Sequence, residues 1–162
     1  KDINAQLDLV SAGFDLLPRG ACFSAYGSAA TTGIATAVDT KINFATELYD
    51  PDGVFAASRF TVPANAPGYY SFMAQIEWAA KASDSACDIA LYKNGALLVR
   101  GFTVTTDAAL SLRCAIAQDV LLAAADYIEV YGRRTGTTTR DTVAGVNTYF
   151  CGHQFRANGA QG

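Results

Sequence analysis

The sequence predicts an all-β domain, a sandwich of two sheets in the jelly-roll arrangement, preceded by one short helical segment. Two observations predict this fold class. From residue 20 onward, short apolar runs are separated by turn residues, which is typical of strands. After residue 19 no further stretch of useful length has the spacing of a helix. About eight strands in a domain of this size indicate a double-sheet jelly roll or a related sandwich.

Length, composition and charge limit the classes of protein to which the chain can belong. Its 162 residues fit one domain and exclude two. A content of 51% hydrophobic and 17% charged residues excludes intrinsic disorder, and the charged residues interrupt the apolar runs too often for a transmembrane span. The formal net charge of -3 argues against phosphate backbones as partners. We therefore expect neither nucleic-acid binding nor membrane insertion.

Residues 1–19 are predicted as a helical stalk or capping segment. Their apolar residues are spaced by four, three, four and three positions, at Ile3, Leu7, Val10, Phe14 and Leu17. This alternation lines one face of a helix and calls for a partner surface. Two interpretations stay open: the helix caps its own domain, or it is the end of an oligomeric stalk whose upstream part is absent from the sequence.

Residues 20–162 are predicted as the head domain. Its candidate strands are 21–27, 34–49 with an internal break, 54–62, 69–79, 86–93, 96–105, 109–117, 126–133 and 147–156. Turn residues separate them, most clearly at 50–53, 65–68 and 94–95. Asn94 and Gly95 predict a two-residue hairpin, because both residue types tolerate a positive φ.

Some predicted strands carry large apolar side chains on both faces, notably 69–78 and 148–155. In 126–133, by contrast, Ile128 and Val130 alternate with polar and aromatic residues, as in the half-buried strand of an outer sheet. A sheet that is apolar on both faces needs a second cover, and this chain has no spare helix to provide it. We therefore predict that another copy of the chain covers this sheet. The residues predicted at the resulting interface are Tyr69, Met73, Tyr149, His153 and Phe155.

The four cysteines, Cys22, Cys87, Cys114 and Cys151, lack the paired spacing of a zinc site. Cys87 and Cys114 alternate with aliphatic residues, so we predict that both are reduced and buried in the core. This prediction favours folding in a reducing compartment. Disulfides remain the alternative, because a sequence does not fix the pairing of cysteines.

No group of residues in the sequence is typical of an enzyme. His153 is the only histidine, and its predicted strand places it on one face with Tyr149, Cys151 and Phe155, as a packed interface residue. Residues two apart on a strand lie about 7 Å apart, too far for Cys151 and His153 to form an activated pair. The acidic turn at 50–53 lacks the glutamate of a calcium loop. We predict a protein without enzymatic activity and without a cofactor.

Residues 133–141 form a polar, locally basic stretch between two predicted strands. One interpretation is a solvated loop. The other is a contact surface, in which threonine hydroxyls and arginine side chains bind acidic or neutral sugars with help from neighbouring tyrosines. Both interpretations expect the arginines to be exposed. The candidate ligand-binding residues are Arg133, Arg134, Arg140, Thr137, Thr138, Tyr127 and Tyr131.

Several motifs, in order along residues 20–156, resemble the tumour-necrosis-factor-like family that includes the globular heads of complement component one, subcomponent q. They are Phe44, Asp50, Phe60, the Gly-x-Tyr-x-Phe core at 68–72, Tyr-Lys-Asn-Gly at 92–95, Asp-Tyr-Ile at 126–128 and Phe-Cys-Gly at 150–152. The core at 68–72 is the most specific of these. The resemblance implies a jelly roll of about ten strands that forms tight homotrimers on a stalk and serves as a recognition head. It is also compatible with a structural calcium ion, for which no ligand residue can be assigned.

Three departures from this family pattern bear on the function. Ala125 and Cys151 stand where the family often has Gly and Ser, and no Gly-X-Y repeat precedes the domain. The Ala- and Thr-rich sequence, with Arg-Phe-Thr-Val-Pro at 59–63 and Leu-Tyr-Lys-Asn-Gly at 91–95, resembles the bacterial and bacteriophage versions. This resemblance implies an attachment tip at the virion surface that contacts cell-surface polysaccharide. The alternatives are a capsid-decoration or head-fibre component that binds other virion proteins, and a secreted signalling ligand.

Overall fold

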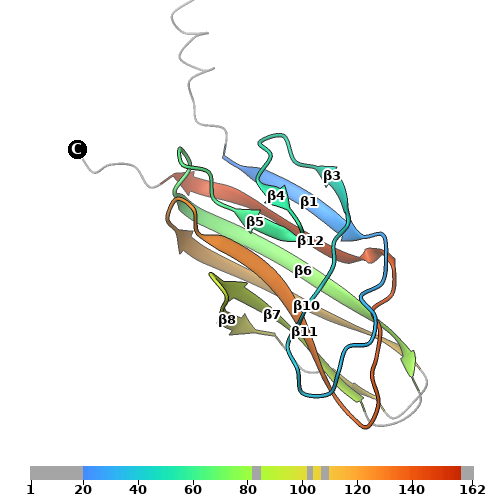
Figure 1. The fold of residues 1–162 in the computed structure, drawn as a ribbon. Coiled ribbons are helices and arrows are strands. Elements are labelled where there is room, and N and C mark those ends of the chain that lie inside the picture. Colours follow the sequence, from blue (N-terminus) through green and yellow to red (C-terminus); the bar gives the residue numbers. More distant parts are fainter. Residues whose placement is uncertain (1–19, 82–84, 102–103, 107–109, 158–162) are drawn as a thin grey trace, which may run out of the picture.

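The computed structural model describes residues 20–81, 85–101, 104–106 and 110–157. The predicted helical segment 1–19 lies outside these residues. The described residues form two antiparallel sheets packed face to face, so the predicted all-β sandwich is confirmed (Figure 1). β1 begins and β12 ends at the same end of the sandwich, and the loop between β11 and β12 lies at the opposite end.

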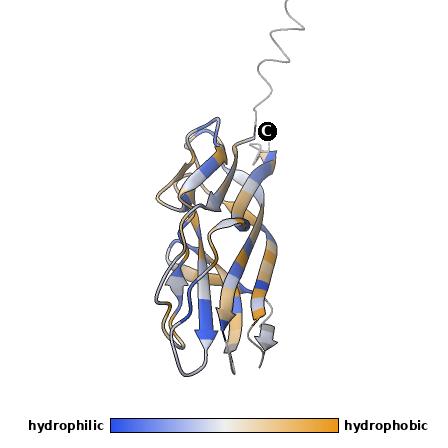
Figure 2. Ribbon diagram, turned by 90° about the vertical axis from the view of Figure 1, so that its right-hand side faces the viewer, coloured by the Kyte–Doolittle hydropathy of each residue, from blue (hydrophilic) through white to orange (hydrophobic). Residues whose placement is uncertain are grey.

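Sheet 1 has the order β10-β6-β12-β1-β3. Its strands are β1 (Cys22–Gly27), β3 (Thr46–Tyr49), β6 (Gly68–Lys81), β10 (Leu110–Leu122) and β12 (Gly145–Ala157). Sheet 2 has the order β4-β5-β11-β7-β8, with β2 paired to β11 and β9 paired to β7. Its strands are β2 (Thr40–Lys41), β4 (Phe55–Ala56), β5 (Arg59–Thr61), β7 (Ser85–Lys93), β8 (Ala96–Arg100), β9 (Val104–Thr106) and β11 (Tyr127–Thr135). The strands carry both hydrophobic and hydrophilic residues (Figure 2), and burial alternates from one residue to the next in β1 and along most of β10.

Most predicted strands correspond to observed ones, but two predictions of a single strand are wrong. The segment 54–62 is a hairpin of β4 and β5, because the chain turns at 57–58, and 96–105 contains β8 and β9 as separate strands. The hairpin at Asn94 and Gly95 is confirmed, since both residues have positive φ angles of 52° and 78°. The break predicted within 34–49 separates β2 from β3. β10 runs five residues beyond its predicted end because its ladder with β6 continues until Leu122 pairs with Gly68.

The core between the sheets is aromatic. Phe23 lies with its ring centroid 4.8 Å from that of Phe150 and 5.3 Å from that of Phe60. Gly152 makes this packing possible, because a Cβ there would lie 2.4 Å from Cδ1 of Phe72. Cys87 and Cys114 are both buried in the core, which confirms that part of their prediction, and neither forms a disulfide among the described residues.

Two arginines of the predicted binding loop are instead part of the interior. Arg134 is 1% and Arg140 2% exposed, so the expectation that both are in solvent is wrong. Nε of Arg140 donates to the carbonyl oxygen of Ala79 at 2.6 Å, and Nη2 donates to that of Leu110 at 2.9 Å. The side chain thus joins the β11–β12 loop to β6 and β10. A long aliphatic stem suits such a position because it packs in the core while the guanidinium satisfies backbone carbonyls.

Candidate recognition surface

The outward side of sheet 2 is built on β11. The strand points Ile128 and Val130 into the core, where both are fully buried. Its alternate residues Tyr127, Tyr131 and Arg133 are partly exposed on the other side, as the sequence predicted. Basic side chains from neighbouring strands join them there. We call this surface the outer face of sheet 2; it comprises Asp39, Lys41, Arg59, Tyr92, Arg100, Tyr127, Glu129, Tyr131 and Arg133.

Glu129 organises the middle of this face. Its side chain is only 4% exposed, and one carboxylate oxygen accepts from Nζ of Lys41 at 2.7 Å and from Nε of Arg59 at 2.8 Å. The hydroxyl of Tyr131 donates to the other oxygen at 3.3 Å. Burial alone would raise the pKa of Glu129, but the hydrogen bonds from Lys41 and Arg59 hold it below its ordinary value. Glu129 is therefore a fixed anion that orients two cations.

Replacing Glu129 with glutamine is expected to lower the free energy of unfolding by about 2 kcal/mol at neutral pH. Two cations lose their partner, and solvent screens part of that loss. Since folding lowers the pKa of Glu129 below its ordinary value of 4.5, its contribution is full above that pH and is lost as the pH falls through the folded value. Urea unfolding measured from pH 7 to pH 3 should show that the free energies of unfolding of wild type and Glu129→Gln become equal in acid. The exposed Glu47 provides the control, Glu47→Gln. A cost for Glu129→Gln that does not change with pH would contradict this role.

Tyrosine rings are fixed in place on both sides of Glu129. The rings of Tyr92 and Tyr131 lie with their centroids 4.1 Å apart, and the Tyr92 hydroxyl donates to Asp39 at 2.7 Å. The guanidinium carbon of Arg59 lies 4.1 Å from the ring centroid of Tyr127. Aromatic rings held in this way can pack against a ligand at little cost in conformational entropy.

Arg133 differs from the other cations of this face. Lys41 and Arg59 bind Glu129, and Arg100 binds the carboxylates of Asp39 and Asp88 at 2.8 and 2.6 Å. Nε of Arg133 is buried and has no hydrogen-bond partner within the part of the chain that the structure describes. The rest of the Arg133 side chain is partly exposed, and its charge helps to lower the pKa of Asp39 on the same face.

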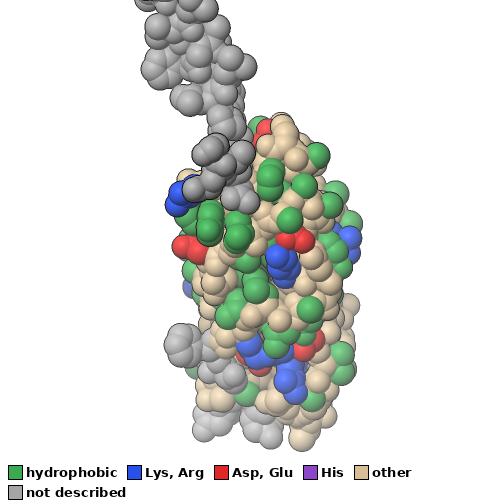
Figure 3. All heavy atoms as spheres, turned by 90° about the vertical axis from the view of Figure 1, so that its left-hand side faces the viewer, with side chains coloured by type: hydrophobic (Ala, Val, Ile, Leu, Met, Phe, Trp, Pro, Cys, Tyr) green, Lys and Arg blue, Asp and Glu red, His purple; other side chains and the backbone are tan. Residues whose placement is uncertain are grey.

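The predicted loop residues differ in position. Thr137 and Thr138 are exposed beyond the end of β11, whereas Arg134 and Arg140 are buried. The structure therefore brings Tyr127, Tyr131 and Arg133 together on one surface and removes two arginines from it. Basic and acidic side chains also lie against each other in groups on the side of the molecule drawn in Figure 3.

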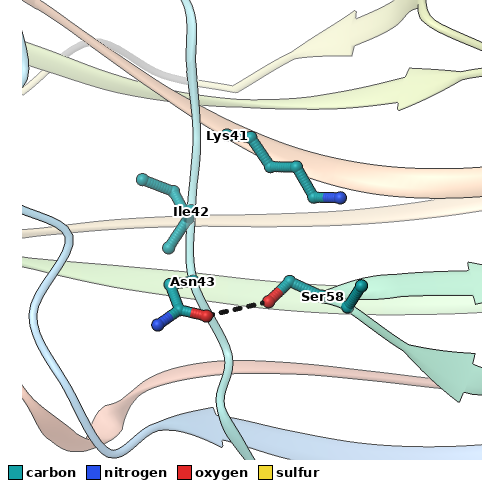
Figure 4. A pocket seen from close by; sticks show the side chains of 5 residues that line it. Lys41, Ile42, Asn43 and Ser58 are labelled. Atoms are coloured by element: carbon teal, nitrogen blue, oxygen red, sulfur yellow. Dashed lines mark hydrogen bonds between the residues drawn. The ribbon is translucent and has the colours of Figure 1, made fainter.

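A pocket of about 360 Å³ opens beside this face (Figure 4). β2 and β5 pair with the same edge of β11, at residues 131–132 and 127–129, and the pocket lies near the junction between them. It is lined by Lys41, Ile42, Asn43, Ala57 and Ser58. The sequence analysis missed this pocket. Residues 41–44 alternate between polar and apolar types as a strand does. Nothing in their local sequence indicates that the turn at 57–58 folds against them.

The turn side of the pocket is fixed by one hydroxyl group. Oγ of Ser58 accepts from the backbone N–H of Phe44 at 2.8 Å and donates to Oδ1 of Asn43 at 3.2 Å. Ser58 is 6% exposed. The β4–β5 turn is therefore tied to the segment that follows β2, so the pocket is preformed.

The outward side of sheet 1 exposes large apolar and aromatic side chains. Tyr69 is 37%, Met73 50% and Phe155 51% exposed. Tyr149 is half-buried and His153 is exposed, and their register with β6 places both on this side of the sheet. All five residues predicted at an interface therefore lie on one face, which we call the open face of sheet 1.

Two cysteines also lie on the open face of sheet 1. Cys22 pairs with His153 in the ladder between β1 and β12, and Cys151 pairs with Met73 in the next ladder; both cysteines are free. Burial is the main cause of the raised pKa of Cys151. Among the described residues, no three His, Cys, Asp or Glu side chains gather closely enough to hold a metal ion. The described part of the chain also contains no helix long and apolar enough to cross a membrane.

The architecture matches solved structures over most of the chain. The globular domain of zebrafish complement 1qA protein superposes with a TM-score of 0.63 and 17% identity, covering 85% of this chain and 99% of that domain. The chain has the C1q/TNF-like jelly-roll fold. The Eiger TNF of S. frugiperda has a TM-score of 0.60 at 11% identity, with 89% of this chain and 98% of that one covered. Murine APRIL has a TM-score of 0.59 at 13% identity, with 83% and 98% covered.

The C1q/TNF-like fold confirms the structural part of the resemblance found in the sequence. No protein-family model and no curated protein matches the sequence. The most specific motif has a structural explanation in this fold. A Cβ on Gly68 would lie 2.3 Å from the carbonyl oxygen of Arg156, so the first motif residue must be glycine where β6 meets β12. Tyr70 and Phe72 then point into the aromatic core.

Proposed function

We propose that the chain is the head of a homotrimeric recognition protein without enzymatic activity. In this proposal the open face of sheet 1 joins three copies, and the outer face of sheet 2 contacts the ligand. The observation that carries it is the contrast between the two faces. One exposes Tyr69, Met73 and Phe155, and the other carries ordered ion pairs and tyrosines.

The open face of sheet 1 supports self-assembly because its middle is uncharged. Met73 has Ala117 and Cys151 as its neighbours on the adjacent strands. Charged residues surround this centre: Asp119 lies two positions from Ala117 on β10, and Arg113 pairs with Glu77, with a separation of 3.1 Å between nitrogen and oxygen. An exposed face of this kind is rare on monomers and typical of interfaces. A solved relative in fold is named as the globular domain of a complement protein, which agrees with a head domain.

The outer face of sheet 2 supports ligand binding because it stays free when sheet 1 is covered. Tyr127, Tyr131 and Arg133 are its proposed contact residues, with Thr137 and Thr138 at the end of the strand. Arg134 and Arg140 are not proposed, because both are buried. The proposed location is the virion surface, as an attachment tip that contacts host polysaccharide. Its support is the likeness of the sequence to bacteriophage versions of the fold.

Binding to a panel of bacterial surface polysaccharides and cells tests this function. Wild type should bind at least one surface, and the double variant Tyr131→Ala, Arg133→Ala should bind it at least tenfold more weakly, because an aromatic contact and a charge-assisted contact are lost together. Lys93→Ala is the charge-matched control, since Lys93 lies on the same sheet but is paired with Asp126 at 2.8 Å. Equal binding by wild type and the double variant would contradict the assignment. Binding to purified capsids and to no cell surface would also contradict it, in favour of capsid decoration.

A further inference from the structure

The pocket beside the outer face of sheet 2 has the size and rigidity of a ligand site. Its volume of about 360 Å³ falls within the range of small-molecule pockets. The pocket is set into sheet 2, whereas the interface residues lie on sheet 1, so assembly through the open face of sheet 1 leaves it available.

Hydrogen-bond donors dominate the polar side of this pocket. Lys41 has three N–H donors, and one of them is used within the described residues, by Glu129. Asn43 uses Oδ1 to accept from Ser58, which leaves its amide nitrogen without a described partner. Figure 4 shows the amide nitrogen of Asn43 directed away from Ser58. A ligand group that fits these donors must accept hydrogen bonds.

The charge around the pocket favours an anion. Lys41 and Arg59 carry two positive charges against the single negative charge of Glu129. Lys41 keeps 32% of its side chain exposed, so its ammonium group remains accessible after it pairs with Glu129. Glu129 therefore positions Lys41 without neutralising the whole cluster.

Backbone strain in the pocket wall is a second, independent observation. Ala57 and Ser58 have positive φ angles of 50° and 58°, in a region that residues other than glycine rarely adopt. Such strain tends to persist at ligand sites, where it holds groups in place. Here the turn presents the exposed methyl group of Ala57 in the same pocket as Lys41 and Asn43. The pocket thus combines an apolar wall with an anion-binding side.

We propose that this pocket binds the carboxylate of an acidic sugar unit, such as a uronic acid within a surface polysaccharide. The carboxylate accepts from Nζ of Lys41, a ring hydroxyl accepts from Nδ2 of Asn43, which points to the other side of the segment, and the C–H face of the ring packs on Ala57. This assignment rests on the proposed recognition function and names the class of ligand. A neutral sugar should bind more weakly because it offers Lys41 no anion. A small carboxylate should bind more weakly because it does not cover the methyl group of Ala57.

Calorimetry and NMR titration with glucuronate, glucose and acetate test the assignment. Wild type should bind glucuronate at millimolar concentration and at least tenfold more tightly than glucose or acetate. Lys41→Gln should weaken glucuronate binding at least tenfold, Lys41→Arg should retain most of it, and the control Lys93→Gln should not change it. If Lys41→Gln is unstable, Asn43→Ala provides the second test, with the same expected loss.

The assignment is wrong if wild type does not bind glucuronate, if acetate or glucose binds equally well, or if Lys41→Gln and Asn43→Ala both bind like wild type. Its failure can be told apart from failure of the proposed function. A trimer that binds polysaccharide through Arg133 but not glucuronate contradicts only the pocket assignment. A monomer that binds glucuronate through Lys41 contradicts only the trimeric head.

Discussion

Replacing Arg140 with alanine is expected to lower the free energy of unfolding by about 3–5 kcal/mol, the range for breaking a buried polar network. The change leaves the carbonyl oxygens of Ala79 and Leu110 without their donor and opens a cavity beside Cys87. Both losses occur in the interior, where an unsatisfied acceptor costs most. Urea denaturation at neutral pH measures the effect.

The matched control for Arg140 is Arg133→Ala. Arg133 is the partly exposed arginine of the same region, and its removal should change the free energy of unfolding by less than about 1 kcal/mol. Similar small losses for both variants would show that the guanidinium of Arg140 does not hold the β11–β12 loop to β6 and β10. A large loss for Arg133→Ala would show that its side chain has a structural role.

Replacing Met73 with glutamate is expected to abolish the trimer, with a loss of at least 1000-fold in the apparent association constant. Met73 is 50% exposed in the single chain and stands at the uncharged centre of the open face of sheet 1. Assembly would bury the new carboxylate in each of three copies, and its neighbours on the adjacent strands, Ala117 and Cys151, offer no cation. Sedimentation velocity across a concentration series measures the change.

Leu97→Glu is the control for Met73→Glu. Leu97 is 51% exposed, which closely matches Met73, but it lies on β8 in sheet 2. The same charge on this other sheet should leave the assembly intact. Loss of assembly in both variants, or in Leu97→Glu alone, would place the interface elsewhere.

The strands could be predicted from the sequence because strand periodicity and turn chemistry are local properties. The alternation of Ile128 and Val130 with Tyr127 and Tyr131 was enough to orient β11 correctly. The two-faced patterns of 69–78 and 148–155 likewise placed their side chains on the open face of sheet 1. In each case the relevant neighbours lie within the same strand.

The recognition surface could be predicted only in part, because burial and pairing depend on contacts distant in sequence. Arg140 has the loop-like surroundings of an exposed residue, yet its acceptors lie on β6 and β10. Glu129 fits the outward alternation of β11, and only the approach of Lys41 and Arg59 makes it a buried anion. The pocket depends in the same way on Asn43 meeting Ser58.

The mass of the native chain in solution tests the central claim most directly, because the recognition head requires the open face of sheet 1 to be covered by two further copies. Light scattering coupled to size-exclusion chromatography at micromolar concentration should give three times the 17.0 kDa of one chain. A stable, folded species of 17.0 kDa would show that this face needs no partner and would contradict the trimeric head.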